Sequence, residues 1–160
     1  MDIKLIPGYD HKETIRELFS EYTDMLIAGD SRFEKYLGMQ NFDEELRHLE
    51  HKYGEPEGRL YIALVGGRVA GCIGLRKIDD SRCEMKRLYV RPEFRGAHLG
   101  EFLAKKIIDD ARAIGYKELL LDTLPFLQSA IHLYEKLGFV LIDKYNDSPM
   151  DTSIFMKLTL

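Results

Sequence analysis

Residues 86–100 combine basic side chains, a proline and two glycines between an expected strand and an expected helix. The first turn of a helix presents unpaired backbone N–H groups and the positive end of the helix dipole, and both attract anions. Glycine in such a turn lets a ligand approach the backbone closely. The phosphate-loop patterns G-x-x-x-x-G-K-[ST] and G-x-G-x-x-G do not occur in the segment. These residues therefore predict an anion-binding turn that differs from both patterns.

Two ionisable side chains near this turn could take part in proton transfer. Tyr134 lies in residues 130–139, whose apolar spacing is typical of an amphipathic helix that ends at Gly138. Its phenol could donate a proton or simply pack in the core. Glu84 lies midway along an expected central strand, where a carboxylate needs a partner or a function. It could act as a base or pair with a basic neighbour such as Lys86.

Together the two segments resemble the acyl-CoA signature of the GNAT N-acetyltransferase superfamily. In that signature a strand ends in L-x-V and is followed by [Q/R]-x-x-G-x-[G/A] at the start of a helix. Arg95 and Gly100 fill the first and last positions of the second pattern, and His98 replaces its middle glycine. The later segment is similar to the family's A-x-x-L-Y-x-x-x-G-F helix and turn, with Leu127 where the family often has asparagine. The resemblance extends over roughly residues 59–160.

The resemblance implies an acetyl-CoA-dependent N-acetyltransferase that moves an acetyl group to a small-molecule or peptide amine by direct attack on the thioester. Acetyl-CoA would be the co-substrate, and no metal would be needed. Glu84 would be the general base, and Tyr134 the general acid for the departing thiolate. The pantetheine arm would pair with the backbone of residues 88–90, and the pyrophosphate would bind to residues 95–100. The cofactor-binding residues implied in this way are Leu88, Tyr89, Val90, Arg95, Gly96, Ala97, His98, Leu99 and Gly100.

Ordinary pKa values limit both proton transfers. A phenol has a pKa of about 10 and a thiol about 8.5, so moving the proton of Tyr134 to a thiolate costs about 2 kcal/mol. Transfer from an ammonium group to Glu84 costs about 8 kcal/mol. Tyr134 could therefore assist by hydrogen bonding. Glu84 would need an environment that strengthens it as a base, a water relay, or a substrate that loses its proton on binding. The backbone N–H of Leu88 or Tyr89 is the simplest donor to the oxyanion.

A non-catalytic acyl-CoA-binding or regulatory domain is the alternative that the same signature leaves open. The amine acceptor is not identified by any motif, and only the charge distribution bears on it. Residues 82–106 carry seven basic and three acidic side chains, which suits an anionic cofactor. Residues 1–57 carry seven basic and fourteen acidic ones. If those acids line the acceptor side they favour a cationic amine, although solvated helix faces explain them more simply.

Several further side chains have less specific patterns. His48 and His51 lie one helical turn apart without a third or fourth ligand, so a solvated helix face is expected rather than a metal site. Asp122, near the end of a buried strand, is expected to cap the next turn. Lys86 and Arg87 could attract cofactor phosphates, with one of the two pointing to the opposite sheet face. The remaining aromatic candidates, which could line a pocket or pack in the core, are Tyr36, Tyr53 and Tyr145.

The elements that must position these residues alternate in the order of a mixed sheet with helices. The resemblance implies an α/β fold (an α+β mixed sheet) in which a twisted, mostly antiparallel sheet is flanked by about four helices. Its central parallel pair, residues 82–90 and 118–123, would splay apart at one end. Residues 1–160 are expected to form one such domain. Strands are predicted at residues 2–6, 59–65, 68–78, 82–90, 118–123, 139–145 and 153–160, and helices at residues 12–28, 42–53, 100–114 and 130–137.

The composition fits a folded domain of ordinary size. Of the 160 residues 45% are hydrophobic and 31% charged, which is enough for a core without disulfides. The net charge of −4 argues against nucleic acid as a partner. The sequence has no apolar run of about 20 residues for a membrane and no signal-peptide pattern. Cys72 and Cys83 lie in apolar contexts that suit a reducing cytoplasm, and both a monomer and a homodimer stay open.

Overall fold

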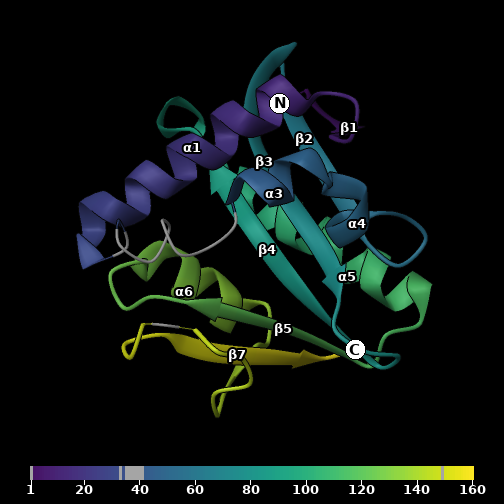
Figure 1. Ribbon diagram of the computed structural model, residues 1–160, viewed down its shortest axis with the longest axis vertical. Coiled ribbons are helices and arrows are strands. Elements are labelled where there is room, and N and C mark those ends of the chain that lie inside the picture. The colour runs from purple at the N-terminus through teal and green to yellow at the C-terminus, as the bar shows by residue number, and fades with distance from the viewer. Residues whose placement is uncertain (1, 33, 35–41, 149) are drawn as a thin grey trace.

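The computed structural model describes residues 2–32, 34, 42–148 and 150–160, and it shows a twisted sheet with helices on both faces (Figure 1). Tyr36 lies outside the described residues. The strands follow the order β1-β2-β3-β4-β5-β7-β6 across the sheet. The strands are β1 Ile3–Pro7, β2 Arg59–Val65, β3 Arg68–Lys77, β4 Arg82–Val90, β5 Glu118–Thr123, β6 Val140–Ile142 and β7 Ile154–Thr159. The helices are α1 Lys12–Gly29, α3 Phe42–Arg47, α4 Leu49–Tyr53, α5 Leu99–Ile114 and α6 Gln128–Lys136, with a short 3-10 turn, η1, at Pro92–Phe94.

The centre of the sheet is a parallel pair that soon separates. β4 and β5 are parallel, whereas the other neighbouring strands are antiparallel. The parallel ladder runs only from Arg82 opposite Glu118 to Glu84 opposite Leu120. Beyond these pairs the two strands diverge. A mostly antiparallel sheet with a splayed central pair is therefore confirmed.

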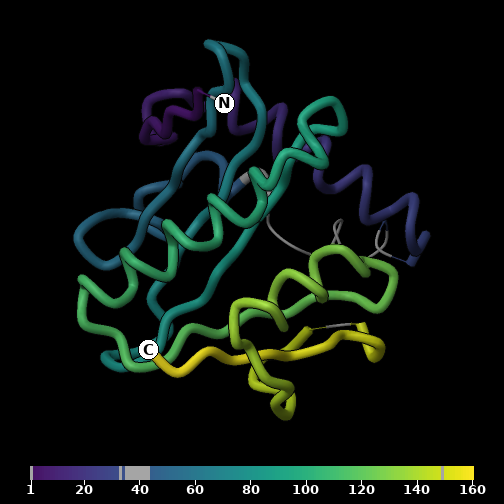
Figure 2. Tube along the Cα trace, turned by 180° about the vertical axis from the view of Figure 1, so that it is seen from behind, coloured from purple at the N-terminus to yellow at the C-terminus, as the bar shows by residue number. Residues whose placement is uncertain are grey.

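The helices divide the core between the two faces of the sheet. α5 and α6 cover one face, and the cluster beneath them includes Leu103, Ile107 and Tyr134 (Figure 2). α1, α3 and α4 cover the other face, where Phe19 and Leu49 are fully buried. Each helix contributes the apolar stripe that its spacing predicts. None of the helices in the described part of the chain combines the length and the apolar character that crossing a lipid bilayer requires.

The observed ends of the elements agree best with the predicted ends where a buried segment is bounded by turn residues. β2, β4 and β5 have the predicted ends. The helix expected over residues 42–53 is instead two short helices, because the backbone leaves the helical region at His48 with φ −129°. The strand expected over residues 139–145 is shorter, since β6 lies at the sheet edge and its side chains Val140 and Leu141 are 58% and 72% exposed.

A β-bulge interrupts β4 just after the parallel pair. Between the register partners Gly74 and Cys72, β3 has one residue and β4 has two, Arg87 and Leu88. Arg87 has φ +59°. The inserted residue places Lys86 and Arg87 both on the face of α3 and α4, while Leu88 packs on the α5 face. The expectation that Lys86 and Arg87 point to opposite faces is therefore wrong, because the alternation of side chains stops at a bulge.

Candidate active site

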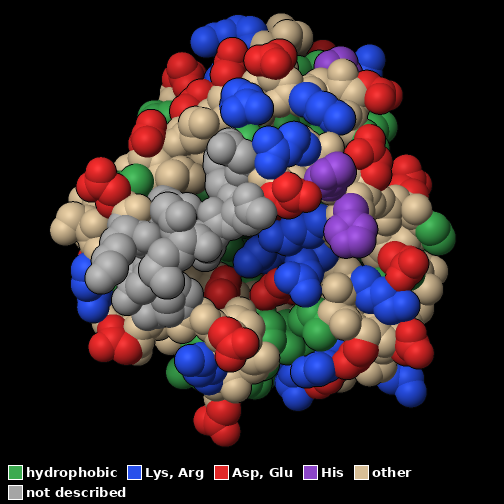
Figure 3. Space-filling view, viewed as in Figure 1, with side chains coloured by type: hydrophobic (Ala, Val, Ile, Leu, Met, Phe, Trp, Pro, Cys, Tyr) green, Lys and Arg blue, Asp and Glu red, His purple; other side chains and the backbone are tan. Residues whose placement is uncertain are grey.

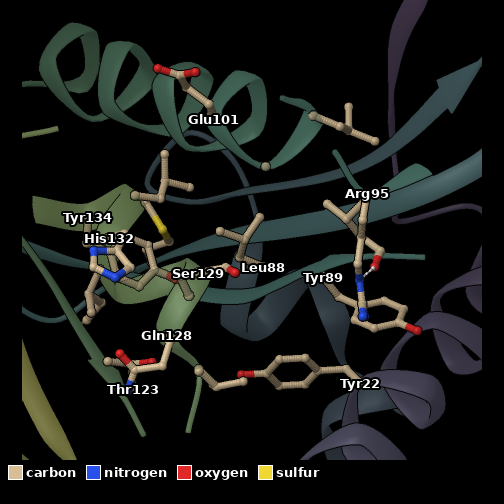
Figure 4. A pocket seen from close by; sticks show the side chains of 18 of the residues that line it. Tyr22, Leu88, Tyr89, Arg95, Glu101, Thr123, Gln128, Ser129, His132 and Tyr134 are labelled. Atoms are coloured by element: carbon tan, nitrogen blue, oxygen red, sulfur yellow. Dashed lines mark hydrogen bonds between the residues drawn. The ribbon is translucent and has the colours of Figure 1, made fainter. Parts of the chain in front are cut away.

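A cavity of about 670 Å³ opens where β4 and β5 separate. Helices α5 and α6 border it on one face of the sheet, and Tyr22 of α1 reaches it from the other. Figure 4 shows Tyr89 and Arg95 on one side of the cavity and His132 and Tyr134 on the other. The predicted cofactor-binding residues that line the cavity are Leu88, Tyr89, Val90, Arg95, Gly96, His98, Leu99 and Gly100, so that Ala97 alone of the predicted set is not in its wall.

The edge of β4 that faces the cavity is open to a ligand. Within the described strands, β5 pairs with β4 no further than Glu84, and Leu88 has no register partner in β3. An unpaired strand edge presents N–H and C=O groups that can pair with an extended chain. At the end of this edge the carbonyl of Val90 accepts a hydrogen bond from Arg95 Nε at 3.0 Å. A ligand with amide groups could therefore add to β4 as a strand does.

The N-terminus of α5, where the sequence predicts an anion-binding turn, forms one end of the cavity. A methyl group added to Gly100 would meet Leu133 and Val90 only at 3.8 and 4.0 Å. One added to Gly96, which has φ +85°, would meet no atom within 4 Å among the described residues. The turn therefore leaves space in front of the first N–H groups of α5. Space, unpaired donors and the positive end of a 16-residue helix together fit a diphosphate.

Two side chains of this turn adopt positions that their places in the motif do not predict. His98 has φ +61°, a left-handed conformation that favours glycine, and its side chain is 81% exposed. The imidazole thus extends into solvent while the backbone takes a glycine-like shape. The guanidinium of Arg95 lies over the Tyr89 ring, 5.9 Å from its centroid, and 3.6 Å from Met25 Sδ. The anion-binding end is therefore built mainly from backbone groups.

Tyr134 projects from α6 into the cavity wall and is 7% exposed. Its ring packs against Phe139, with 5.6 Å between the ring centroids. Burial raises the pKa of Tyr134 well above its usual range, and the nearby Tyr22 and Asp122 raise it further. The phenol consequently stays protonated at physiological pH and can serve as a hydrogen-bond donor.

Comparison with known families matches residues 14–139 to the Acetyltransferase (GNAT) family. The chain belongs to this family. An uncharacterized N-acetyltransferase from Schizosaccharomyces pombe is 40% identical over 126 residues, which cover 78% of this chain and 77% of that protein.

Two solved structures show the same relationship at the level of the fold and the cofactor. A crystal structure of an acetyltransferase from Streptococcus agalactiae shares the fold with a TM-score of 0.78 at 23% identity, covering 99% of this chain and 98% of that one. A GNAT family acetyltransferase from Elizabethkingia anophelis, solved with acetyl-CoA bound, is 25% identical with a TM-score of 0.56, covering 65% of this chain and 77% of that one. The chain is thus a GNAT acyltransferase, and acetyl-CoA is the co-substrate that this family uses.

In this GNAT acetyltransferase, Glu84 lies behind the cavity wall. It is 3% exposed and is not one of the lining residues. Its Oε2 accepts a hydrogen bond from Tyr145. Its Oε1 lies 3.6 Å from Arg76 Nη1 and 4.0 Å from Lys86 Nζ. Because Lys86 itself lines the cavity, Glu84 is separated from the cavity by one side chain.

Asp122 lines the cavity of the acetyltransferase directly. Its Oδ2 accepts a hydrogen bond from Asn146 Nδ2 at 3.0 Å. The sequence favoured a turn cap for this residue, but a polar side chain at the carboxyl end of a parallel strand is where α/β proteins often place functional groups. This position in the strand could have identified Asp122 as a candidate site residue from the sequence. Tyr145 and Asn146, which are adjacent, thus hold the two carboxylates Glu84 and Asp122.

A buried ion pair joins α3 to the bulge of β4. Arg87 Nη2 lies 2.6 Å from Glu45 Oε2, and its guanidinium is 5.3 Å from the centroid of the Phe19 ring. Tyr53, which is fully buried, donates a hydrogen bond to the same carboxylate. Burial alone would raise the pKa of Glu45, but Arg87 and Lys52 lower it to about 2. Tyr53 is therefore a core residue, and Arg87 is tied to Glu45.

Proposed function

We propose that this GNAT acetyltransferase moves an acetyl group from acetyl-CoA to an amine at the opening between β4 and β5. The separation of these strands carries the proposal, because it places an anion-binding helix end and the phenol of Tyr134 on one cavity. The residues present fit the co-substrate: residues 95–100 would hold its diphosphate, and residues 88–90 would pair with its amide groups. When bound, acetyl-CoA supplies an activated thioester.

Tyr134 would donate a hydrogen bond to the sulfur atom that leaves. Full transfer of its proton to a thiolate is unfavourable for an ordinary phenol, and burial raises the pKa of Tyr134 further. A hydrogen bond still stabilises the charge that develops on sulfur. The N–H of Leu88, which has no register partner in the described part of β3, would stabilise the charge on the carbonyl oxygen in the same way.

Glu84 would receive the amine proton through a water relay, since its carboxylate is not in the cavity wall. The amine nitrogen forms a bond to the carbonyl carbon, the carbon–sulfur bond breaks, and one proton leaves the nitrogen. That proton would pass beside Lys86 to Glu84. Asp122 lines the cavity and is the other carboxylate that could accept the amine proton.

The first test measures thiol release from acetyl-CoA with a panel of amines. We expect turnover with at least one amine, and a loss of kcat of about tenfold or more in Tyr134→Phe with CoA affinity retained. The matched control is Tyr116→Phe, which removes a phenol that donates to the Glu57 carbonyl outside the cavity. Equal losses in the two variants would contradict the role of Tyr134. Binding of CoA with no turnover of any amine would instead indicate a non-catalytic binding domain.

The second test assigns the base from pH–rate profiles. If Glu84 accepts the proton, Glu84→Gln removes the acidic limb of the kcat/KM profile and Asp122→Asn leaves that limb in place. If Asp122→Asn removes the acidic limb and Glu84→Gln leaves it in place, Asp122 is the base.

A further inference from the structure

A cluster of cations surrounds Glu84 on the face of the sheet opposite α5. We propose that the acceptor amine also carries a carboxylate, and that Arg76 and Lys86, assisted by Lys52, bind this carboxylate. The inference rests on the proposed function, since it names the class of amine that the enzyme acetylates. These three side chains are called the cation cluster below.

The cation cluster extends from the cavity into a neighbouring cleft. Lys86 lines the main cavity, and Arg76 and Lys52 line a cleft of about 600 Å³ on the α3 and α4 face. Arg76 and Lys86 approach the same oxygen of Glu84, so side chains from the walls of both hollows meet at this carboxylate. Figure 3 shows Lys and Arg side chains gathered in this hollow, bordered by two histidines. An anionic group of a substrate in the cavity could therefore reach the cluster.

The cation cluster has more positive charge than its carboxylates neutralise. Among the described residues of this region, the three cations Lys52, Arg76 and Lys86 lie beside two carboxylates, Glu45 and Glu84, and Glu45 also pairs with Arg87. Other charged groups of the cleft have partners of their own: Lys77 pairs with Glu57 and Asp80, and Glu44 pairs with Arg47 and His48.

Arg76 and Lys86 retain donors for a ligand. Their nitrogen atoms lie 3.6 and 4.0 Å from Glu84 Oε1, which is beyond the usual hydrogen-bond distance. Their side chains are 37% and 22% exposed, so solvent or a substrate can reach them. Arg87, in contrast, is bound to Glu45 at 2.6 Å. A guanidinium and an ammonium group arranged in this way are suited to a carboxylate.

The pKa of Lys52 is lowered mainly by burial, and repulsion by the neighbouring cations contributes a smaller part. Burial lowers the pKa of Lys52, and attraction to Glu45 raises it. Repulsion by Lys86 and Arg87 offsets part of that attraction, so the pKa falls to about 8. A bound anion would relieve this repulsion.

The position of the cation cluster separates it from the cofactor. The diphosphate end of the cavity lies at α5, on the other face of the sheet, and the cations of the cluster face α3 and α4. The many acids of residues 1–57 do not counter this charge, because most of them are exposed and Glu45 is already paired. The local arrangement thus favours an acceptor that carries a carboxylate beside its amine, whereas counting charges along the sequence favoured a purely cationic amine.

The test compares amines that differ only in a carboxylate. Glycine, β-alanine and γ-aminobutyrate are each assayed beside the corresponding amide with saturating acetyl-CoA. We expect at least one of the three amino acids to have a kcat/KM about tenfold or more above that of its amide. Arg76→Met and Lys86→Met should each reduce this ratio to about threefold or less. The matched control is Arg82→Met on the strand of Lys86, whose side chain pairs with Asp79 and lines neither hollow. It should keep the wild-type ratio.

A preference for the amides, or a ratio that neither variant changes, would overturn the inference. If no amine is acetylated, the proposed function fails, and the inference is then decided by binding alone. Glutarate is titrated calorimetrically into the CoA-loaded wild-type protein and into Arg76→Met. Binding that the variant loses supports the carboxylate site, and no binding to the wild type overturns it.

Discussion

The two ends of the active site use different means to recognise charge. At the end proposed for the cofactor, the N-terminus of α5 and the open edge of β4 present backbone groups, while Arg95 lies over the Tyr89 ring and the imidazole of His98 is largely exposed. On the face proposed for the acceptor, the charges belong to side chains that are partly or fully buried and lie beside carboxylates, such as Lys86 and Arg87. Backbone donors remain whatever side chains change, whereas buried charges depend on their partners. The acceptor face is therefore the end that should be more sensitive to substitution.

Removing Arg87 should have the largest effect on stability. Arg87→Met leaves the carboxylate of Glu45 buried with only Lys52 and Tyr53 as partners, and we expect a loss of about 3 kcal/mol in the free energy of unfolding. Urea denaturation measures it. The control from the other end is Arg95→Met, an exposed arginine for which the loss should stay below about 1 kcal/mol. Similar losses for the two arginines would abolish the contrast between the ends.

A double variant sharpens the same comparison. Arg87→Met combined with Glu45→Met removes both charges, so it should be less destabilised than the sum of the single variants. Additive losses would mean that Arg87 acts through its packing on Phe19 rather than through the ion pair.

Lys52 should give the next largest effect, visible as a pH dependence. Its pKa is about 8 in the folded protein, below the value of about 10.4 in an unfolded chain. Between these pH values the unfolded chain holds a proton that the folded protein has lost, so stability rises with pH. We expect the unfolding free energy of the wild type, relative to Lys52→Met, to increase by about 2 kcal/mol from pH 8 to pH 10.

Lys77 provides the control for this measurement. Hydrogen bonds to Glu57 and Asp80 hold the pKa of Lys77 above its usual range, so its protonation in the folded protein does not change over the same window. The difference between the wild type and Lys77→Met should accordingly stay flat from pH 8 to pH 10. A flat difference for Lys52 as well would remove the evidence for excess positive charge beside Glu84.

The contrast between the ends also explains what could be predicted from the sequence. The ends of β2, β4 and β5 follow from local alternation and turn residues, and the cofactor turn follows from a contiguous motif. The acceptor face has no such signal. Its cations Lys52, Arg76 and Lys86 come from three elements, and Glu45, which pairs with Lys52, comes from a fourth. Charge counted along the chain therefore could not reveal this local cluster of cations.

The bulge of β4 escaped prediction for a related physical reason. A left-handed residue in a strand is usually marked by glycine, but here it is Arg87, whose conformation is held by the buried pair with Glu45. Only the tertiary contact identifies the position. Asp122 is intermediate, since its place near the end of a buried strand beside the expected splay was visible, but the sequence favoured a turn cap over a place in the cavity wall.

The smallest effect tests the cofactor end, where the backbone should matter more than the side chain. His98 is held at φ +61°, a conformation that costs a residue with a side chain about 1 kcal/mol and glycine almost nothing. His98→Gly should therefore raise the free energy of unfolding by about 0.5 to 1 kcal/mol and leave the affinity for CoA the same or tighter. Urea denaturation and calorimetry measure the two quantities.

Ala97→Gly is the matched control, because Ala97 is the preceding residue of the same turn and is not left-handed. There the added freedom of the unfolded chain should lower stability by about 0.5 kcal/mol. Opposite signs at adjacent positions would show that the turn requires a backbone shape rather than an imidazole. A loss of CoA affinity above about tenfold in His98→Gly would show instead that the side chain contacts the cofactor, and this end would then also depend on side chains.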